Sequence, residues 1–288
     1  MRLPAFELHR PSRLDELFEL MAAHGPAARL MSGGTDLLPS LKRRKHACGH
    51  VVALKGIAEL DGLDFDATRG LEIGANTILI DVARHAVVRE RYPVLASAID
   101  VLATPQVRHK ATVAGTLCTA SPCADTATPL MALGALAVLR SPSGTREVKV
   151  EDFIHGPGRT ALAESEVLAS VRVPVPPADL RTTYSKFSPR SRVDIAAVNL
   201  TLALRMREDV IEALDLFLGT VAPTPMRAAR AEALLRGQTA SVELCARAAR
   251  AARGECRPIT DVRASAEYKA ELVEVLTRRA LVALTGVA

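Results

Sequence analysis

LMSGGTDLLPSLKRRK, residues 30–45, is a predicted strand and a predicted helix separated by two adjacent glycines, Gly33 and Gly34. Glycine tolerates positive φ angles and has no Cβ, so a glycine pair after a strand lets several backbone N–H groups converge on an anion. Thr35 adds a hydroxyl donor, and Asp36 can accept a hydrogen bond from a sugar hydroxyl. The alternative is a plain strand-to-helix turn, and this motif alone favours neither interpretation.

A second stretch rich in small residues, ATVAGTLCTASPCAD at residues 111–125, is predicted to be a strand that enters a loop. Small side chains let a backbone approach a ligand, and hydroxyl groups donate hydrogen bonds to phosphate. Asp125 is predicted to cap the following helix and to bind a sugar hydroxyl. Two such loops, both after strands, suit the two halves of a pyrophosphate. The candidate ligand residues of this loop are Thr112, Ala114, Gly115, Thr116, Thr119 and Ser121.

GPGRTA, residues 156–161, matches the dinucleotide fingerprint G-x-G-x-x-A, with Asp179 about 20 residues further on. That fingerprint must open a crossover helix between parallel strands. Only a few residues separate it from a strand predicted to begin near Glu166, and Pro157 lies inside the turn. A Rossmann unit is therefore excluded, and any dinucleotide must be bound in another way.

YSKFSPRSRVDIAAVNL, residues 184–200, holds a basic stretch between Lys186 and Asp194, ahead of an apolar strand. A lysine beside an electron-rich ring stabilises negative charge on that ring. The alternative is a solvated hairpin edge protected by charge, and the segment alone favours this alternative.

The composition predicts a folded protein of two or three modest domains. Its 288 residues are 49% hydrophobic, enough for a sizeable core. The net charge of +5 comes from dispersed basic residues, while aromatic residues make up only 3% and tryptophan is absent. The stacking platforms of single-strand nucleic-acid binders are therefore missing, and we expect no nucleic-acid partner.

Several functional classes find no support in the sequence. The first residues lack the apolar core of a signal peptide, and no apolar run approaches the ~18 to 20 residues that span a bilayer, so we expect no membrane insertion and a cytoplasmic location. The five cysteines include no C-x-x-C pair and the histidines show no zinc spacing, so we expect reduced thiols and no metal site. Neither G-x-S-x-G nor H-E-x-x-H occurs, so we assign no catalytic nucleophile, acid or base.

The proline-rich stretch VPVPPADL, residues 173–180, is the best candidate for a domain boundary. Small alternating α and β units are predicted before it. Strands followed by helices are predicted after it, which is an α+β pattern.

Together these segments resemble the FAD-binding subunits of the molybdenum hydroxylases, the family of the carbon monoxide dehydrogenase medium subunit and of the flavin domain of xanthine dehydrogenase. The similarity covers nearly the whole chain, and the matching segments come in the family's order. They are SGGTDLLPSLK, TVAGTLCTASPCADTATPLMALGA, EDFIHGPGRTAL, EVLASVRVP, YSKFSPRSRVDIA and RASAEYKAELVEVLTRRAL.

The resemblance implies an α+β fold of the vanillyl-alcohol-oxidase, or PCMH, type. Two α+β subdomains, residues 1–57 and 58–176, would clasp FAD. Residues 177–288 would form a CO dehydrogenase flavoprotein-like C-terminal domain, with a three-stranded sheet and a helical bundle.

The resemblance also implies an oxidoreductase subunit that transfers electrons. A small partner subunit would carry two [2Fe-2S] clusters and a large one the molybdopterin cofactor, in a dimer of heterotrimers. Electrons would pass from the clusters through FAD to an external acceptor. Two alternatives stay open, a stand-alone flavoprotein oxidase and a scaffold subunit that has lost FAD.

The family's cofactor contacts carry over to named positions of this chain. The first loop would line the pyrophosphate and ribityl of FAD with Leu30, Met31, Ser32, Gly33, Gly34, Thr35, Asp36 and Leu37. Thr112 to Thr116 would form a second glycine loop. Asp125 would bind cofactor hydroxyls, Leu168 would pack against the cofactor, and Lys186 and Asp194 would flank the isoalloxazine.

Two departures from the family pattern matter. The family's second loop ends in Gly-Gly-Asn, whereas this chain has Ala114-Gly115-Thr116. Cys118 and Cys123 lie where the 4-hydroxybenzoyl-CoA reductase flavin subunit begins the cysteine set of an extra [4Fe-4S] cluster. Two thiolates do not satisfy a cluster that needs four, so we predict no iron in this chain.

Overall fold

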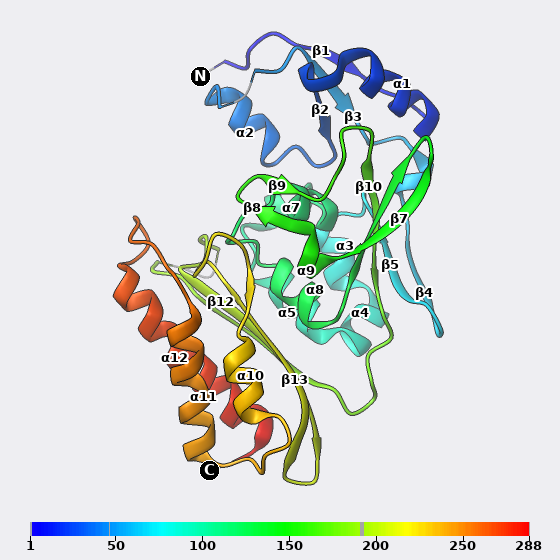
Figure 1. The fold of residues 1–288 in the computed structure, drawn as a ribbon. Coiled ribbons are helices and arrows are strands. Elements are labelled where there is room, and N and C mark those ends of the chain that lie inside the picture. The colour runs from blue at the N-terminus through cyan, green and yellow to red at the C-terminus, as the bar shows by residue number, and fades with distance from the viewer. Residues whose placement is uncertain (1, 46, 191–192, 288) are drawn as a thin grey trace.

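Three β-sheets follow one another along the chain in the computed structural model, which describes residues 2–45, 47–190 and 193–287 (Figure 1). The sheets have three, five and four strands, and a fourth, two-stranded sheet is a short hairpin. The first sheet lies at one end of the molecule and the third, with the last helices, at the other (Figure 1). Within the part of the chain described, no helix is long and apolar enough to cross a membrane.

The first sheet is parallel, with strand order β1-β3-β2, and carries a helix on each face. Its elements are β1 (Glu7–His9), α1 (Leu14–His24), the 3-10 turn η1 (Gly25–Ala27), β2 (Ala28–Met31), α2 (Leu37–Lys42) and β3 (His50–Ala53). Neighbouring strand residues point to opposite faces, so Val52 packs with α1 and Val51 packs with α2. The Ser32–Asp36 loop leaves this sheet at the carboxyl end of β2.

The second sheet is antiparallel, with strand order β4-β5-β10-β6-β7. After the 3-10 turn η2 (Ala58–Leu60), its strands are β4 (Leu63–Asp66), β5 (Gly70–Gly74), β6 (Leu136–Ser141), β7 (Gly144–Lys149) and β10 (Val167–Val173). β10 comes last in the chain yet lies at the centre, and only Arg172 of its seven residues is not buried. A register shift between Leu168 and Ser170 interrupts its pairing with β6.

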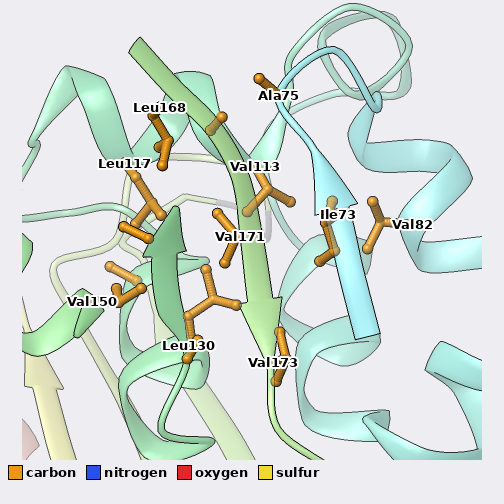
Figure 2. Close-up of a cluster of buried hydrophobic side chains, with 14 of the residues drawn as sticks. Ile73, Ala75, Val82, Val113, Leu117, Leu130, Val150, Leu168, Val171 and Val173 are labelled. Atoms are coloured by element: carbon orange, nitrogen blue, oxygen red, sulfur yellow. The ribbon is translucent and has the colours of Figure 1, made fainter. Parts of the chain in front are cut away.

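The helices between β5 and β6 share one hydrophobic core with this sheet. They are α3 (Leu79–Arg84), α4 (Ala86–Arg91), α5 (Pro93–Asp100), α6 (Pro105–Arg108), α7 (Val113–Thr119) and α8 (Ala127–Ala132). In Figure 2, Leu117 of α7 and Leu130 of α8 lie in one buried cluster with Val171 of β10. Complete burial of a side chain of this size adds about 1.5–3 kcal/mol to the free energy of unfolding.

The Ala111–Asp125 segment corrects a prediction, because its Val113–Thr119 part is helix rather than strand and loop. α7 begins after Thr112, whose Oγ1 accepts a hydrogen bond from the Gly115 amide at 3.0 Å. Of the predicted strand, an isolated bridge between Ile78 and Thr112 remains. The N-cap and the burial of Val113 and Leu117 against the sheet favour the helix. Ala114 therefore has helical backbone, which any L-residue accepts.

The GPGRTA segment forms a tight hairpin, as expected for a chain without a Rossmann unit. After α9 (Val150–Phe153), strands β8 (Ile154–Gly156) and β9 (Arg159–Thr160) pair around a turn in which Gly158 has φ +71°. No helix begins between this hairpin and β10.

The last third of the chain is a sheet followed by helices. The sheet contains β11 (Arg181–Phe187), β12 (Val198–Arg207), β13 (Val210–Gly219) and β14 (Met226–Arg227), and the helices are α10 (Ala229–Leu235), α11 (Val242–Glu255) and α12 (Ala266–Thr285). The three long strands match the predicted three-stranded sheet, and the two-residue β14 adds a fourth at its edge. The helices and β12 and β13 bury a second hydrophobic core of their own.

Candidate functional site

A cleft separates the Ser32–Asp36 loop from α7. It encloses about 440 Å³. Residues of both small-residue segments line it, Cys118 included, together with neighbours such as Arg29 and Gly158. The predicted site residues in this lining are Leu30, Met31, Ser32, Gly33, Gly34, Thr35, Asp36, Leu37, Thr112, Gly115, Thr116 and Thr119.

The two adjacent glycines are needed for different reasons. A Cβ on Gly33 would lie 1.9 Å from the carbonyl oxygen of Lys110, so the loop reaches the segment before α7 only because Gly33 has no side chain. Gly34 has φ +70°, a left-handed conformation that other residues rarely adopt. A hydrogen bond of 3.3 Å from Thr119 Oγ1 to Asp36 Oδ2 also joins the two sides of the cleft.

A larger cavity of about 740 Å³ adjoins the first and shares Arg29, Leu30, Ser32, Gly115 and Cys118 with it. Its lining is more apolar and comes from α1, β2, α7 and the segment that leads into β10. The apolar lining residues include Phe18, Met21, Leu54, Ala114, Leu162 and Leu168. One continuous cleft therefore has a polar half beside the glycine pair and an apolar half beside α1.

Hydroxyl groups of the cleft are held in place by the chain itself. Ser32 Oγ donates to the Ala75 carbonyl at 3.2 Å. Thr116 Oγ1 donates to the carbonyl of Val113 at 2.8 Å and contacts Thr126 Oγ1 at 2.7 Å. With these protons directed into the protein, the polar half offers a ligand backbone N–H groups, hydroxyl lone pairs, the Thr35 hydroxyl and the Arg29 guanidinium.

Behind α7, a buried ion pair joins Asp125 to Lys186 of β11. Lys186 Nζ donates to Asp125 Oδ2 at 2.8 Å and to the Val101 carbonyl at 3.0 Å, while Tyr184 Oη donates to Asp125 Oδ1 at 2.6 Å. The two charged side chains are only 7% and 4% exposed. Burial raises the pKa of Asp125, and the Lys186 ammonium and Tyr184 hydroxyl oppose that rise. Burial also raises the pKa of Tyr184 well above its ordinary value, and the neighbouring Asp125 charge adds to this.

The predicted capping role of Asp125 is wrong. The N-cap of α8 is Thr126, and both carboxylate oxygens of Asp125 are used by side chains of β11. A buried carboxylate is stabilised more by a cation and side-chain donors than by one amide at a helix end. Asp125 therefore binds Lys186 and Tyr184 and does not cap α8. The hydrogen bond between Thr126, the neighbour of Asp125, and Thr116 of the cleft lining connects this ion pair to the cleft.

Four predicted residues lie outside the linings of the two cavities. Asp125 and Lys186 pair with each other, and Asp194 pairs with the exposed Arg190 at 3.0 Å. Ser121 Oγ accepts a hydrogen bond from the Cys123 amide. The basic stretch between Lys186 and Asp194 therefore does not bring those two side chains to one shared partner among the residues described.

Several residues that line or support the site were not predicted from the sequence. Gly158 belongs to the rejected dinucleotide fingerprint, yet the β8–β9 hairpin places it in the cleft lining, where its amide donates to the Ala120 carbonyl. Arg29 lines both cavities, and its position beside Leu30 was the available signal. Tyr184 has no local signal, because its partner Asp125 is reached only through the tertiary fold.

Comparison with known proteins assigns the family. Residues 4–176 match the FAD binding domain in molybdopterin dehydrogenase, and residues 183–284 match the CO dehydrogenase flavoprotein C-terminal domain. The chain is an FAD-binding subunit of the molybdopterin dehydrogenase family. This confirms the resemblance found in the sequence and makes the chain part of an oxidoreductase.

Relatives of this flavoprotein subunit match it over nearly their whole length. The carbon monoxide dehydrogenase medium chain of Hydrogenophaga pseudoflava is 32% identical over 278 residues, 96% of each chain. The xanthine dehydrogenase FAD-binding subunit of Escherichia coli O157:H7 is 28% identical over 274 residues, 95% of this chain and 94% of that one.

A solved structure confirms the α+β fold of the subunit. It is carbon monoxide dehydrogenase from Hydrogenophaga pseudoflava lacking the Mo-pyranopterin moiety of the molybdenum cofactor. The similarity has a TM-score of 0.94 at 34% sequence identity and covers 98% of this chain and 97% of that chain.

Proposed function

We propose that FAD occupies the cleft between the Ser32–Asp36 loop and α7, with its pyrophosphate in the polar half. The observation that carries this assignment is the bare backbone at Gly33, where a Cβ would strike the Lys110 carbonyl. Without a side chain, Gly33 packs against the segment before α7, which brings the backbone amides of the loop to the same cleft as the N-terminal end of α7. A molecule with a charged pyrophosphate and large ring systems matches a cleft with one polar and one apolar half.

The protein's own residues bind and orient the cofactor in this proposal. Bound FAD supplies the redox chemistry, which amino-acid side chains do not provide. Leu30 and Leu168 exclude water from the apolar half, while the Asp125–Lys186 pair holds α7 through Thr126 and Thr116. The family resemblance still predicts four further residues near the cofactor, namely Asp125, Lys186, Asp194 and Ser121.

The proposed assembly is a dimer of heterotrimers in the cytoplasm, with no nucleic acid and no membrane insertion. One partner is a small iron–sulfur subunit with [2Fe-2S] clusters, and the other is a large molybdopterin subunit. Electrons from the clusters reach an external acceptor by way of this subunit. The relatives support this composition, because they are themselves a medium chain and an FAD-binding subunit of larger enzymes.

We also propose a division of the chain at residues 1–57, 58–176 and 177–288. The separate sheets support both boundaries, and the second hydrophobic core supports the one at residue 177. On this division the cleft lies between the first two parts, so FAD binding would hold them together.

Native purification of the chain with its partners tests the proposal. We expect about one FAD per chain, identified by chromatography after heat release, together with iron–sulfur and molybdopterin subunits. A colourless chain that still binds these partners would support the scaffold alternative. A chain that oxidises a small molecule without partners would support the stand-alone oxidase.

A further inference from the structure

Three histidine side chains from separate elements meet on the α1 side of the first sheet. They are His9 at the end of β1, His24 at the end of α1 and His50 at the start of β3. All three are half-buried, and the ligand atoms that they offer lie within 4.8 Å of one another. The sequence showed no zinc spacing because the three residues are far apart in the chain and only the fold brings them together.

We propose that His9, His24 and His50 form a binding site for a divalent transition-metal ion such as Zn²⁺. Neutral imidazole nitrogens are ligands that Zn²⁺, Cu²⁺ and Ni²⁺ favour, whereas Mg²⁺ and Ca²⁺ favour oxygen. This site is independent of the proposed FAD site, since none of the three histidines lines either cavity of the cleft.

The spacing of the nitrogen atoms fits this chemistry. His9 Nε2 lies 3.0 Å from His50 Nδ1. Two nitrogens bound to one tetrahedral Zn²⁺ at about 2.0–2.1 Å are about 3.3 Å apart, so the separation of this pair fits, and each ring must turn so that its lone pair points at the ion and not at the other ring. The His24 ring stacks on the His50 ring with centroids 3.7 Å apart and planes at 18°, so His24 must tilt out of the stack to direct a nitrogen at the same ion.

A carboxylate stands beside the unused nitrogen of His9. Glu7 Oε1 lies 3.9 Å from His9 Nδ1. Carboxylates next to the second nitrogen of a metal-binding histidine are common, because they orient the ring and favour the tautomer whose other nitrogen is free to bind. The second oxygen of Glu7 lies 3.6 Å from His50 Nδ1, so the Glu7 carboxylate adds a negative charge close to both rings that favours a bound cation.

The metal would join α1 to two strands of the first sheet. β3 pairs with β1 on one side and with β2 on the other, and β2 leads into the Ser32–Asp36 loop. A site assembled only in the folded chain stabilises that chain when the ion binds. We therefore expect metal binding to raise the melting temperature of the full chain.

The test uses the tag-free, full-length chain after treatment with a chelator. Calorimetric titration with Zn²⁺ should show about one ion bound per chain, and Co²⁺ should give the visible absorption of a tetrahedral nitrogen site. His9→Ala and His24→Ala should each weaken Zn²⁺ binding by at least about 100-fold, since loss of a ligand costs more than loss of its orienting partner. His155→Ala, at an exposed position of β8, is the matched control and should leave binding unchanged.

Two results would overturn the proposal. One is a wild-type chain that binds neither Zn²⁺ nor Co²⁺, which would leave the cluster a hydrogen-bonded histidine stack. The other is Zn²⁺ binding that persists in both His9→Ala and His24→Ala, which would place the ion elsewhere, for example on the thiols. Because the titration needs no flavin, its outcome is separate from that of the FAD proposal.

Discussion

A Cβ on Gly33 would lie 1.9 Å from the carbonyl oxygen of Lys110, so these two residues approach as closely as backbone atoms allow. Gly33 follows β2 of the first sheet, and Lys110 precedes α7 of the next part of the chain. Gly33 and Ala111, the neighbour of Lys110, both line the cleft at which the Ser32–Asp36 loop meets α7.

Gly33→Ala should open this contact. The added methyl group forces the loop away from Lys110, and we expect a loss of at least about 1–3 kcal/mol in the free energy of unfolding. The FAD-to-protein ratio of the purified variant should fall sharply. Gly49→Ala is the control, because a Cβ there meets nothing within 4 Å. Full FAD retention in Gly33→Ala would contradict the assigned site.

Thr112→Ala should weaken both α7 and cofactor binding. The variant removes the side-chain acceptor for the Gly115 amide and should cost about 1 kcal/mol of stability. Thr104→Ala removes a comparable cap from α6, outside the cleft lining. Urea denaturation should show similar small losses for both variants, whereas FAD dissociation should accelerate only in Thr112→Ala. Equal FAD dissociation in the two variants would argue against Thr112 as a site residue.

Ala114→Gly restores at residues 114–115 the two glycines that are typical of the family's second loop. Because Ala114 is helical and buried, this change should cost about 0.5–1 kcal/mol of stability and bring no gain in FAD affinity. Thermal denaturation and fluorescence titration with FAD measure the two effects. Tighter FAD binding by Ala114→Gly would show that alanine hinders the cofactor here.

Lys186→Met should leave Asp125 buried without its cation. We expect a loss of about 3–5 kcal/mol in the free energy of unfolding near neutral pH. In Asp125→Asn/Lys186→Met the charge is gone and an acceptor for Tyr184 remains, so the double variant should recover much of this loss. Denaturant unfolding measures the free energy of unfolding of both variants. Equal losses in the single and double variants would mean that Asp125 and Lys186 are not coupled.

The pH dependence of Lys186→Met follows from the pKa of Asp125. Burial already raises this pKa above its ordinary value of 3.8, and Lys186 opposes that rise. Without Lys186 the folded state binds the proton still more tightly than the unfolded state. The variant's stability relative to wild type should therefore be greatest below pH 3.8 and fall as pH rises through the folded-state pKa. Unfolding curves across acidic to neutral pH measure this difference, and a constant difference would contradict it.

Local patterns made the Ser32–Leu37 region predictable. A strand, two glycines and a helix are signalled by neighbouring residues, and the structure has these elements in that order. The same holds for the GPGRTA hairpin, where Pro157 and the short distance to β10 excluded a helix. Such predictions hold because glycine permits and proline imposes backbone conformations that end a helix or strand locally.

Tertiary packing decided what the sequence did not predict. The Val113–Thr119 segment has many β-branched and small residues, and it becomes helical because Val113 and Leu117 bury against the second sheet. Lys186 and Asp194 lie on one segment and are predicted to flank the same ring, and in the structure Lys186 binds Asp125 while Asp194 binds Arg190. Their partners depend on which elements meet, which no local spacing encodes.

The Asp125–Lys186 pair also bears on how the chain matures during translation. Asp125 emerges from the ribosome well before β11, which carries both Lys186 and Tyr184. A nascent chain that ends at β10 has every strand of the five-stranded sheet but no cation for this carboxylate. The cofactor-binding half therefore reaches its full stability only when the C-terminal sheet begins to form. During translation it stays less stable until β11 has been synthesised.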